Sequence, residues 1–115
     1  MKLWIRGNSL RFRVSKTELA KLAETGKVED SVRFSSEQGL RYAIEVRPSG
    51  AVTATFAEAA ILVTLPKARL DPWLRPGEVS VEGSQPIGGG RVLQILLEKD
   101  EAPLGRVGGG DDSVA

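Results

Sequence analysis

The sequence contains no cysteine and no histidine, and only 5% of its 115 residues are aromatic. The missing thiols exclude disulfide bonds and thiolate nucleophiles, and the missing imidazoles exclude the commonest general base. Together these absences remove the usual zinc ligands. A chain without cysteine fits a reducing compartment, so we expect a cytoplasmic protein with no bound metal or cofactor.

Long apolar runs are also missing. No stretch approaches the roughly 18 apolar residues that a membrane-spanning helix needs. Charged residues stand close together near the N-terminus without an apolar run of about seven after them, so we expect no signal peptide. The apolar content of 41% is nevertheless enough for a chain of this length to bury one core.

Charge is distributed unevenly along the chain. Residues 1–50 hold ten Lys/Arg against six Asp/Glu, whereas residues 51–115 hold six against nine. The first half is therefore the better candidate for contact with an anionic surface. The alternative interpretation is an ordinary solvated face.

The run Gly7–Lys16 combines a turn, an alternating strand and a helix start. Lys2–Arg6 alternates apolar and polar residues, Gly7-Asn8 tolerates positive φ, and alternation resumes over Leu10–Val14. This pattern predicts a β-hairpin with Leu3, Ile5, Leu10, Phe12 and Val14 pointing inward.

Helix and strand signals continue directly after the hairpin. Ser15 and Glu18 have the spacing of a capping box, and Gly26 is placed to end the predicted helix. Two further alternating runs, Val28–Phe34 and Leu40–Val46, predict another pair of strands. The first half is therefore expected to have the order β-β-α-β-β.

A constant shift of 51 residues superimposes the apolar pattern of the second half on that of the first. Gly26 falls on Gly77, and further along Tyr42 falls on Leu93. We interpret this match as a duplication, with residues 1–103 forming one domain from two ββαββ repeats, about 1–50 and 51–103. The alternative is that any two such units match somewhere.

The second half differs from the first in three places. Asp71-Pro72 predicts a late helix start, with Asp71 as the cap and Pro72 at the first position. Pro86–Gly90 predicts a flexible loop, in which the phosphate-cradle pattern is weak because Arg91-Val92 and no helix follow. Residues 104–115 are expected to form a disordered, acidic, Gly-rich tail.

The stretch from Trp4 to Val46 resembles the swapped-hairpin family of AbrB-type transition-state regulators and MazE-type antitoxins. The resemblance rests on Gly7-Asn8-Ser9, the alternating Leu10–Val14, the short helix and the strand pair after Gly26. In that family the helix usually opens with proline, which stands here at Pro66 but is replaced by Ser15. The ending Leu97–Asp100 also resembles small uncharacterised bacterial proteins, which brings no function.

The resemblance implies an AbrB-like interleaved small β-barrel, mostly β within the α+β class, in which one chain supplies both halves as a pseudo-dimer. It also implies a non-catalytic module that binds double-stranded DNA through the basic face of the first hairpin. The residues expected at that contact are Lys2, Trp4, Arg6, Arg11 and Arg13. The second hairpin lacks equivalent cations, so the binding should be weak and salt-dependent.

Two other functions are weighed against DNA binding. A protein-interaction adaptor, like an antitoxin, would use the tail or the apolar residues Leu62, Val92 and Leu96, which alternation assigns to solvent. An enzyme is least supported, because the acids Glu98, Asp100 and Glu101 have no base or nucleophile beside them. The protein is expected to be a monomer or a weak dimer.

Overall fold

The computed structural model describes residues 1–100, which form eight strands and two helices with the order β-β-α-β-β in each half. The first half contains β1 (Lys2–Arg6), β2 (Ser9–Val14), α1 (Lys16–Thr25), β3 (Lys27–Arg33) and β4 (Gly39–Arg47). The second half contains β5 (Thr53–Ala57), β6 (Ala60–Pro66), α2 (Lys67–Trp73), β7 (Ser80–Gly88) and β8 (Arg91–Lys99). The expected mostly-β α+β class is confirmed, and the tail expected at 104–115 lies outside the described residues.

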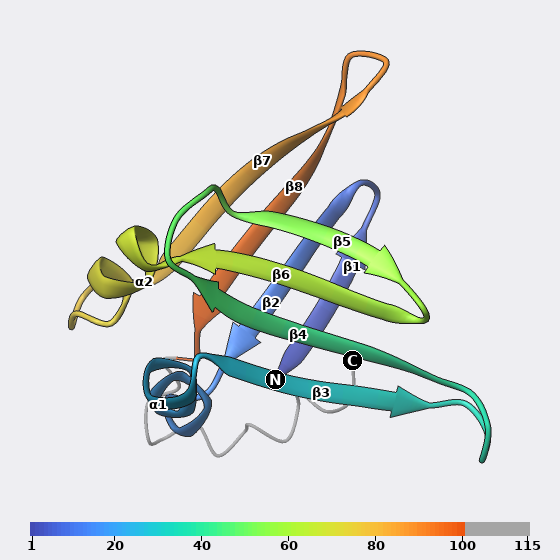
Figure 1. The fold of residues 1–115 in the computed structure, drawn as a ribbon, viewed down its shortest axis with the longest axis horizontal. Coiled ribbons are helices and arrows are strands. Elements are labelled where there is room, and N and C mark those ends of the chain that lie inside the picture. Colours follow the sequence, from blue (N-terminus) through green and yellow to red (C-terminus); the bar gives the residue numbers. More distant parts are fainter. Residues whose placement is uncertain (101–115) are drawn as a thin grey trace.

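Each of the two four-stranded sheets combines one hairpin from each half of the chain (Figure 1). Sheet A has the strand order β1-β2-β8-β7, and sheet B has the order β3-β4-β6-β5. The hairpins are antiparallel, whereas the central pairs, β2 with β8 and β4 with β6, are parallel. Separating the halves would therefore break both sheets.

The core is one apolar cluster shared by both sheets and both helices. Its largest fully buried side chains are Phe12, Val14, Ile95 and Leu97 from sheet A, Ile44, Val63 and Leu65 from sheet B, and Leu22 and Trp73 from the helices. Because every hairpin contributes to this cluster, neither half has a core of its own.

Local signals in the first half predict its elements closely. The turn between β1 and β2 contains Gly7 with a φ of 56°, a left-handed conformation that glycine adopts without strain. Ser15 caps α1 by accepting a hydrogen bond from the Glu18 backbone at 3.1 Å, and Glu18 accepts one from the Ser15 backbone at 2.9 Å. Gly26, with a φ of 85°, ends the helix as expected.

The predicted start of the second helix is wrong. Helix α2 begins at Lys67 after Pro66 and ends at Trp73, so Pro72 lies inside it and Asp71 is not its cap. Asp71 Oδ1 instead forms an ion pair with Lys67 Nζ, which lies one helical turn earlier, at 3.0 Å. Pro72 is the sixth residue of this seven-residue helix, so its missing N–H removes one helix hydrogen bond. Burial of the Trp73 side chain in the core outweighs that cost.

The constant shift of 51 residues is wrong after Gly77. Strand pairing in the first hairpins follows it, since Ile5 pairs with Leu10 where Phe56 pairs with Ile61. In the second hairpin of each half, β3–β4 and β7–β8, equivalent strand positions are 53 residues apart. Tyr42 therefore occupies the position of Ile95, not of Leu93. Two extra residues between Gly77 and β7 cause this change from 51 to 53 residues.

The flexible loop predicted at Pro86–Gly90 is also wrong. Strand β7 continues through Gly88, with a bulge between Pro86 and Gly88, and only Gly89-Gly90 form the turn. Pro86 itself stays opposite Val92, and it is tolerated because β7 is an edge strand of sheet A.

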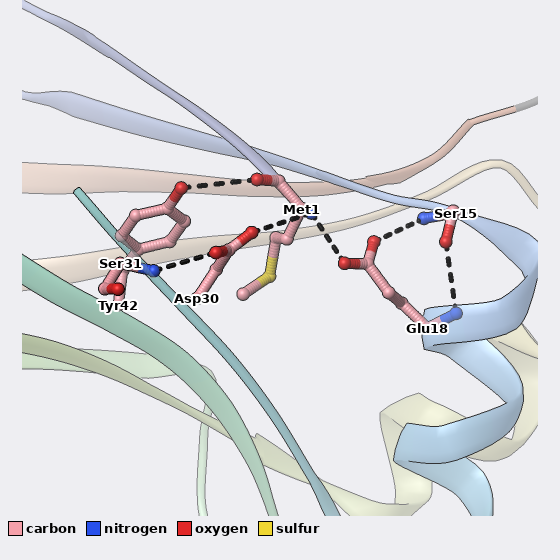
Figure 2. Close-up of polar contacts among 6 residues, drawn as sticks. All are labelled: Met1, Ser15, Glu18, Asp30, Ser31 and Tyr42. Atoms are coloured by element: carbon pink, nitrogen blue, oxygen red, sulfur yellow. Dashed lines mark hydrogen bonds and ion pairs between the residues drawn. The ribbon is translucent and has the colours of Figure 1, made fainter.

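A polar network connects the start of sheet A to α1 and sheet B (Figure 2). The Met1 α-amino group donates to Glu18 Oε2 at 2.6 Å and to Asp30 Oδ2 at 3.3 Å. The Tyr42 hydroxyl donates to the Met1 carbonyl oxygen at 3.4 Å. Through Met1 the network therefore links the start of β1 to α1 and β3 by charged hydrogen bonds and to β4 by a neutral one.

The network shifts the pKa values of its members. Burial alone would raise the pKa of the Glu18 carboxyl, but hydrogen bonds from Met1 and Ser15 outweigh it and hold the pKa below its ordinary 4.5. Burial alone would lower the pKa of the Met1 amine, but Glu18 and Asp30 raise it above 8.0. Burial, then the charges of Asp30 and Glu18, raise the pKa of Tyr42.

Replacing Glu18 by glutamine is expected to flatten the dependence of stability on pH. The lowered pKa of Glu18 gives stabilisation that is complete above its ordinary value of 4.5 and is lost as the pH falls through its folded-state pKa. The raised pKa of Met1 gives stabilisation that is complete below 8.0 and is lost as the pH rises through its folded-state pKa.

Urea denaturation of both proteins at about pH 3, 6 and 9.5 measures this change. Glutamine keeps the capping box, so the loss at about pH 6 should be about 1 kcal/mol or less. An unchanged pH profile in Glu18→Gln would show that the network does not set the acid and alkaline limits.

Candidate nucleic-acid interface

The five side chains expected at the nucleic-acid contact share one surface of sheet A. In β2, Phe12 and Val14 are fully buried, so the alternating residues project from the opposite surface of the sheet. The register of β1 against β2 places the five residues side by side on that surface. We call this surface the basic face; it consists of Lys2, Trp4, Arg6, Arg11 and Arg13.

Ile5 lies on the same side of the hairpin as the buried Phe12, as expected, but 61% of this residue is exposed. Ile5 lies at the tip of the β1–β2 hairpin, where sheet B leaves it uncovered. Phe56, at the equivalent place in the β5–β6 hairpin, is 69% exposed. The alternating pattern gives the side of the strand but not the extent of the opposing sheet.

Trp4 is the centre of the basic face. The guanidinium carbon of Arg11 lies 5.0 Å from the Trp4 ring centroid, and that of Arg13 lies 5.2 Å from it. Both distances are within the roughly 6 Å of a cation–π interaction. The indole therefore helps to hold two cations on the basic face.

The carboxylate of Glu98 also lies at the basic face, where the sequence did not predict it. Its Oε1 atom accepts a hydrogen bond from Arg11 Nε at 2.9 Å and lies 3.5 Å from Arg13 Nη2. Strand β8 lies beside β2, with Arg13 opposite Glu98. The carboxylate orients both arginines and cancels part of their charge.

Arg6 differs from these two arginines. Its side chain is exposed, and within residues 1–100 it has no hydrogen bond or ion pair. It lies at the end of β1 beside the turn, next to Ser9 across the hairpin. Arg6 is therefore a cation of the basic face that an incoming anion meets without displacing a protein partner.

A hollow of about 520 Å³ lies beside the basic face. Its lining combines the apolar residues Trp4 and Leu96 with polar residues of neighbouring strands. The residues that line it are Trp4, Ile5, Arg6, Ser9, Leu10, Arg11, Glu82, Gln94, Ile95 and Leu96. A hollow lined by apolar, hydrogen-bonding and cationic residues suits a planar anionic ligand.

The corresponding surface of sheet B lacks this combination. The strand positions equivalent to the basic face hold Thr53, Thr55, Ala57, Leu62 and Thr64, as the sequence predicts. The hollow at this place measures about 200 Å³ and has no aromatic neighbour except Tyr42, whose ring belongs to the core cluster. Equivalent positions of sheet B therefore serve as internal controls for the basic face of sheet A.

The three apolar residues expected at a protein contact are placed differently from one another. Val92 is 39% exposed, whereas Leu62 and Leu96 are half-buried. Leu96 lines the hollow beside Trp4. The tail that was expected to share this contact lies outside the described residues.

Within residues 1–100, no group of three acidic side chains is arranged to hold a metal ion, and Glu101 of the predicted acidic cluster lies outside this range. No helix in this part of the chain is long and apolar enough to cross a membrane.

Comparison with known proteins gives one match. The model of a family of unknown function, DUF7009, matches residues 1–113. No curated protein and no solved structure matches the chain. The geometry of the molecule is therefore the basis for assigning a function.

Proposed function

The chain belongs to DUF7009, a family of unknown function, and from its geometry we propose that it is a non-catalytic nucleic-acid-binding module. The observation that carries the proposal is the basic face, where four cations and an indole project from sheet A opposite the core. Phosphate contacts by Lys and Arg supply most of the affinity of such modules.

Glu98 is expected to weaken this binding, because it reduces the number of cations that are free to contact phosphate groups. Two of the four cations share its carboxylate, so a phosphate group competes with Glu98 for Arg11 and Arg13. Arg6 has no such competitor within residues 1–100. For a single strand, two to four effective contacts give a slope of log K against log salt of about −1.4 to −2.8.

Neutralising Glu98 is expected to strengthen nucleic-acid binding. In Glu98→Gln the amide oxygen still accepts the hydrogen bond from Arg11, while the competing charge is removed. One additional effective phosphate contact raises the affinity about fivefold at about 0.1 M salt. Fluorescence anisotropy with a labelled oligonucleotide measures this gain, which a misfolded variant could not produce.

Glu45→Gln is the matched control. Glu45 occupies the position of sheet B that corresponds to Glu98, and its carboxylate pairs with Arg47 at 3.2 Å. The net charge changes equally in both variants, so Glu45→Gln should alter the affinity less than about twofold if the basic face is the contact surface. Equal gains from both variants would contradict that location.

The finer architecture belongs to the same proposal. We infer that residues 1–50 and 51–103 are repeats and that they interleave in an AbrB-like barrel, as a pseudo-dimer in one chain. Cross-half strand pairing and the equivalent hairpin registers support this inference. A single repeat of about 50 residues buries too little apolar surface to be stable alone.

Exposed apolar residues support a second candidate function, a protein-interaction adaptor. Phe56 and Val92 are exposed at hairpin ends and are available to a protein partner. A folded protein that binds neither single nor double strands at low salt would favour the adaptor over the nucleic-acid module.

A further inference from the structure

We propose that the basic face binds single-stranded nucleic acid, with an unpaired base against Trp4 in the hollow and the neighbouring phosphate at Arg6. This inference rests on the proposed function and names its substrate class. It follows from the width of the sheet, the chemistry of the hollow and the position of the free cation.

The width of sheet A disfavours insertion into a duplex. The major groove is about 12 Å wide and admits a helix or a two-stranded ribbon. Strand β2 carries Arg11 and Arg13 but has β8 on its other side, and β7 follows beyond it. Four strands at about 4.8 Å spacing place the outer backbones about 14 Å apart, before side chains are added.

The chemistry of the hollow suits a base whose faces are uncovered. Aromatic rings and guanidinium planes stack on unpaired bases, and both are present where Arg11 lies against Trp4. Leu96 adds apolar surface, while Ser9 and Gln94 offer hydrogen-bonding groups to a base edge. In a duplex these faces are stacked within the helix and cannot use such a site.

The position of Arg6 suits the phosphate of the same nucleotide. Arg6 lines the hollow together with Trp4, and its side chain has no partner within residues 1–100. Glu98 pairs with Arg11 and Arg13, which lie over the indole, so this arrangement of Trp4 and the two arginines is formed before a ligand arrives. The volume of about 520 Å³ falls within the range of small-molecule pockets, about 300 to 1,000 Å³.

Tryptophan fluorescence of the full 115-residue chain tests the inference. The probes are a single-stranded DNA of about 12 nucleotides and the duplex of the same sequence, at about 50 mM salt. The single strand is expected to quench Trp4 and to bind about tenfold more tightly than the duplex. Trp73 is 1% exposed and should keep its emission in both titrations.

Three variants separate stacking from general attraction. Trp4→Leu should lose the quenching and bind the single strand at least about fivefold more weakly, whereas Trp4→Tyr should retain most of the affinity measured by anisotropy. Thr55→Leu, at the corresponding position of sheet B, should leave the affinity unchanged.

The outcomes distinguish this inference from the function on which it rests. Duplex binding as tight as single-strand binding, strengthened by Glu98→Gln, would overturn the inference and leave the nucleic-acid module standing. Single-strand binding that Trp4→Leu does not weaken would overturn the stacking contact. No binding of either probe would overturn both proposals.

Discussion

Residues 1–50, produced without the rest of the chain, are expected to be unfolded. Strand β2 would lose its neighbour β8, and β4 would lose its neighbour β6, which leaves two isolated hairpins and α1. The buried side chains Phe12, Val14 and Ile44 would also lose the apolar residues that cover them from the second half. Isolated two-stranded hairpins are at best marginally stable in water.

Circular dichroism and the dispersion of amide signals measure the outcome for each fragment alone and for their mixture. Residues 51–115 should likewise be unfolded alone, and an equimolar mixture should recover the sheet signal because each fragment restores the missing partner strands. The intact chain of 115 residues provides the folded reference. Cooperative unfolding of residues 1–50 alone would contradict the cross-half pairing as the source of stability.

The sequence predicts those elements that depend on neighbours along the chain. Alternation over β1 and β2, the turn at Gly7 and the reciprocal Ser15–Glu18 cap are all local, and the structure contains each of them. These signals also placed the five residues of the basic face on one surface, because a single hairpin carries them all.

Features that depend on pairing between distant segments could not be predicted. Nothing near Glu98 in the sequence indicates that β8 lies parallel to β2, so its ion pairs with Arg11 and Arg13 were missed. The same limit applies to α2, where burial of Trp73 outweighs the local signal of Pro72. Local patterns specify strands and caps, whereas strand order decides which charges meet.

Reversing the charge of Arg6 is expected to have the largest effect on binding of any single substitution. Arg6→Glu removes a cation that has no protein partner within residues 1–100 and places an anion beside the hollow. Loss of one phosphate contact costs about fivefold at about 0.1 M salt, and the new repulsion adds to it, so the affinity should fall at least about tenfold. Reversing Arg11 or Arg13 is less informative, since the new carboxylate would also repel Glu98.

Arg41→Glu is the matched control for Arg6→Glu. Arg41 is an exposed arginine on the surface of sheet B, and its side chain has no ion pair within residues 1–100. Both substitutions change the net charge equally, and neither removes a buried contact. Any difference between the two variants therefore reports the location of the binding surface.

The affinity of these two variants for one labelled single-stranded oligonucleotide, measured by anisotropy at about 0.1 M salt, tests the central claim most directly. The basic face as the contact surface predicts a loss of at least about tenfold in Arg6→Glu and less than about twofold in Arg41→Glu. Equal losses in the two variants, or an unchanged affinity in Arg6→Glu, would contradict it.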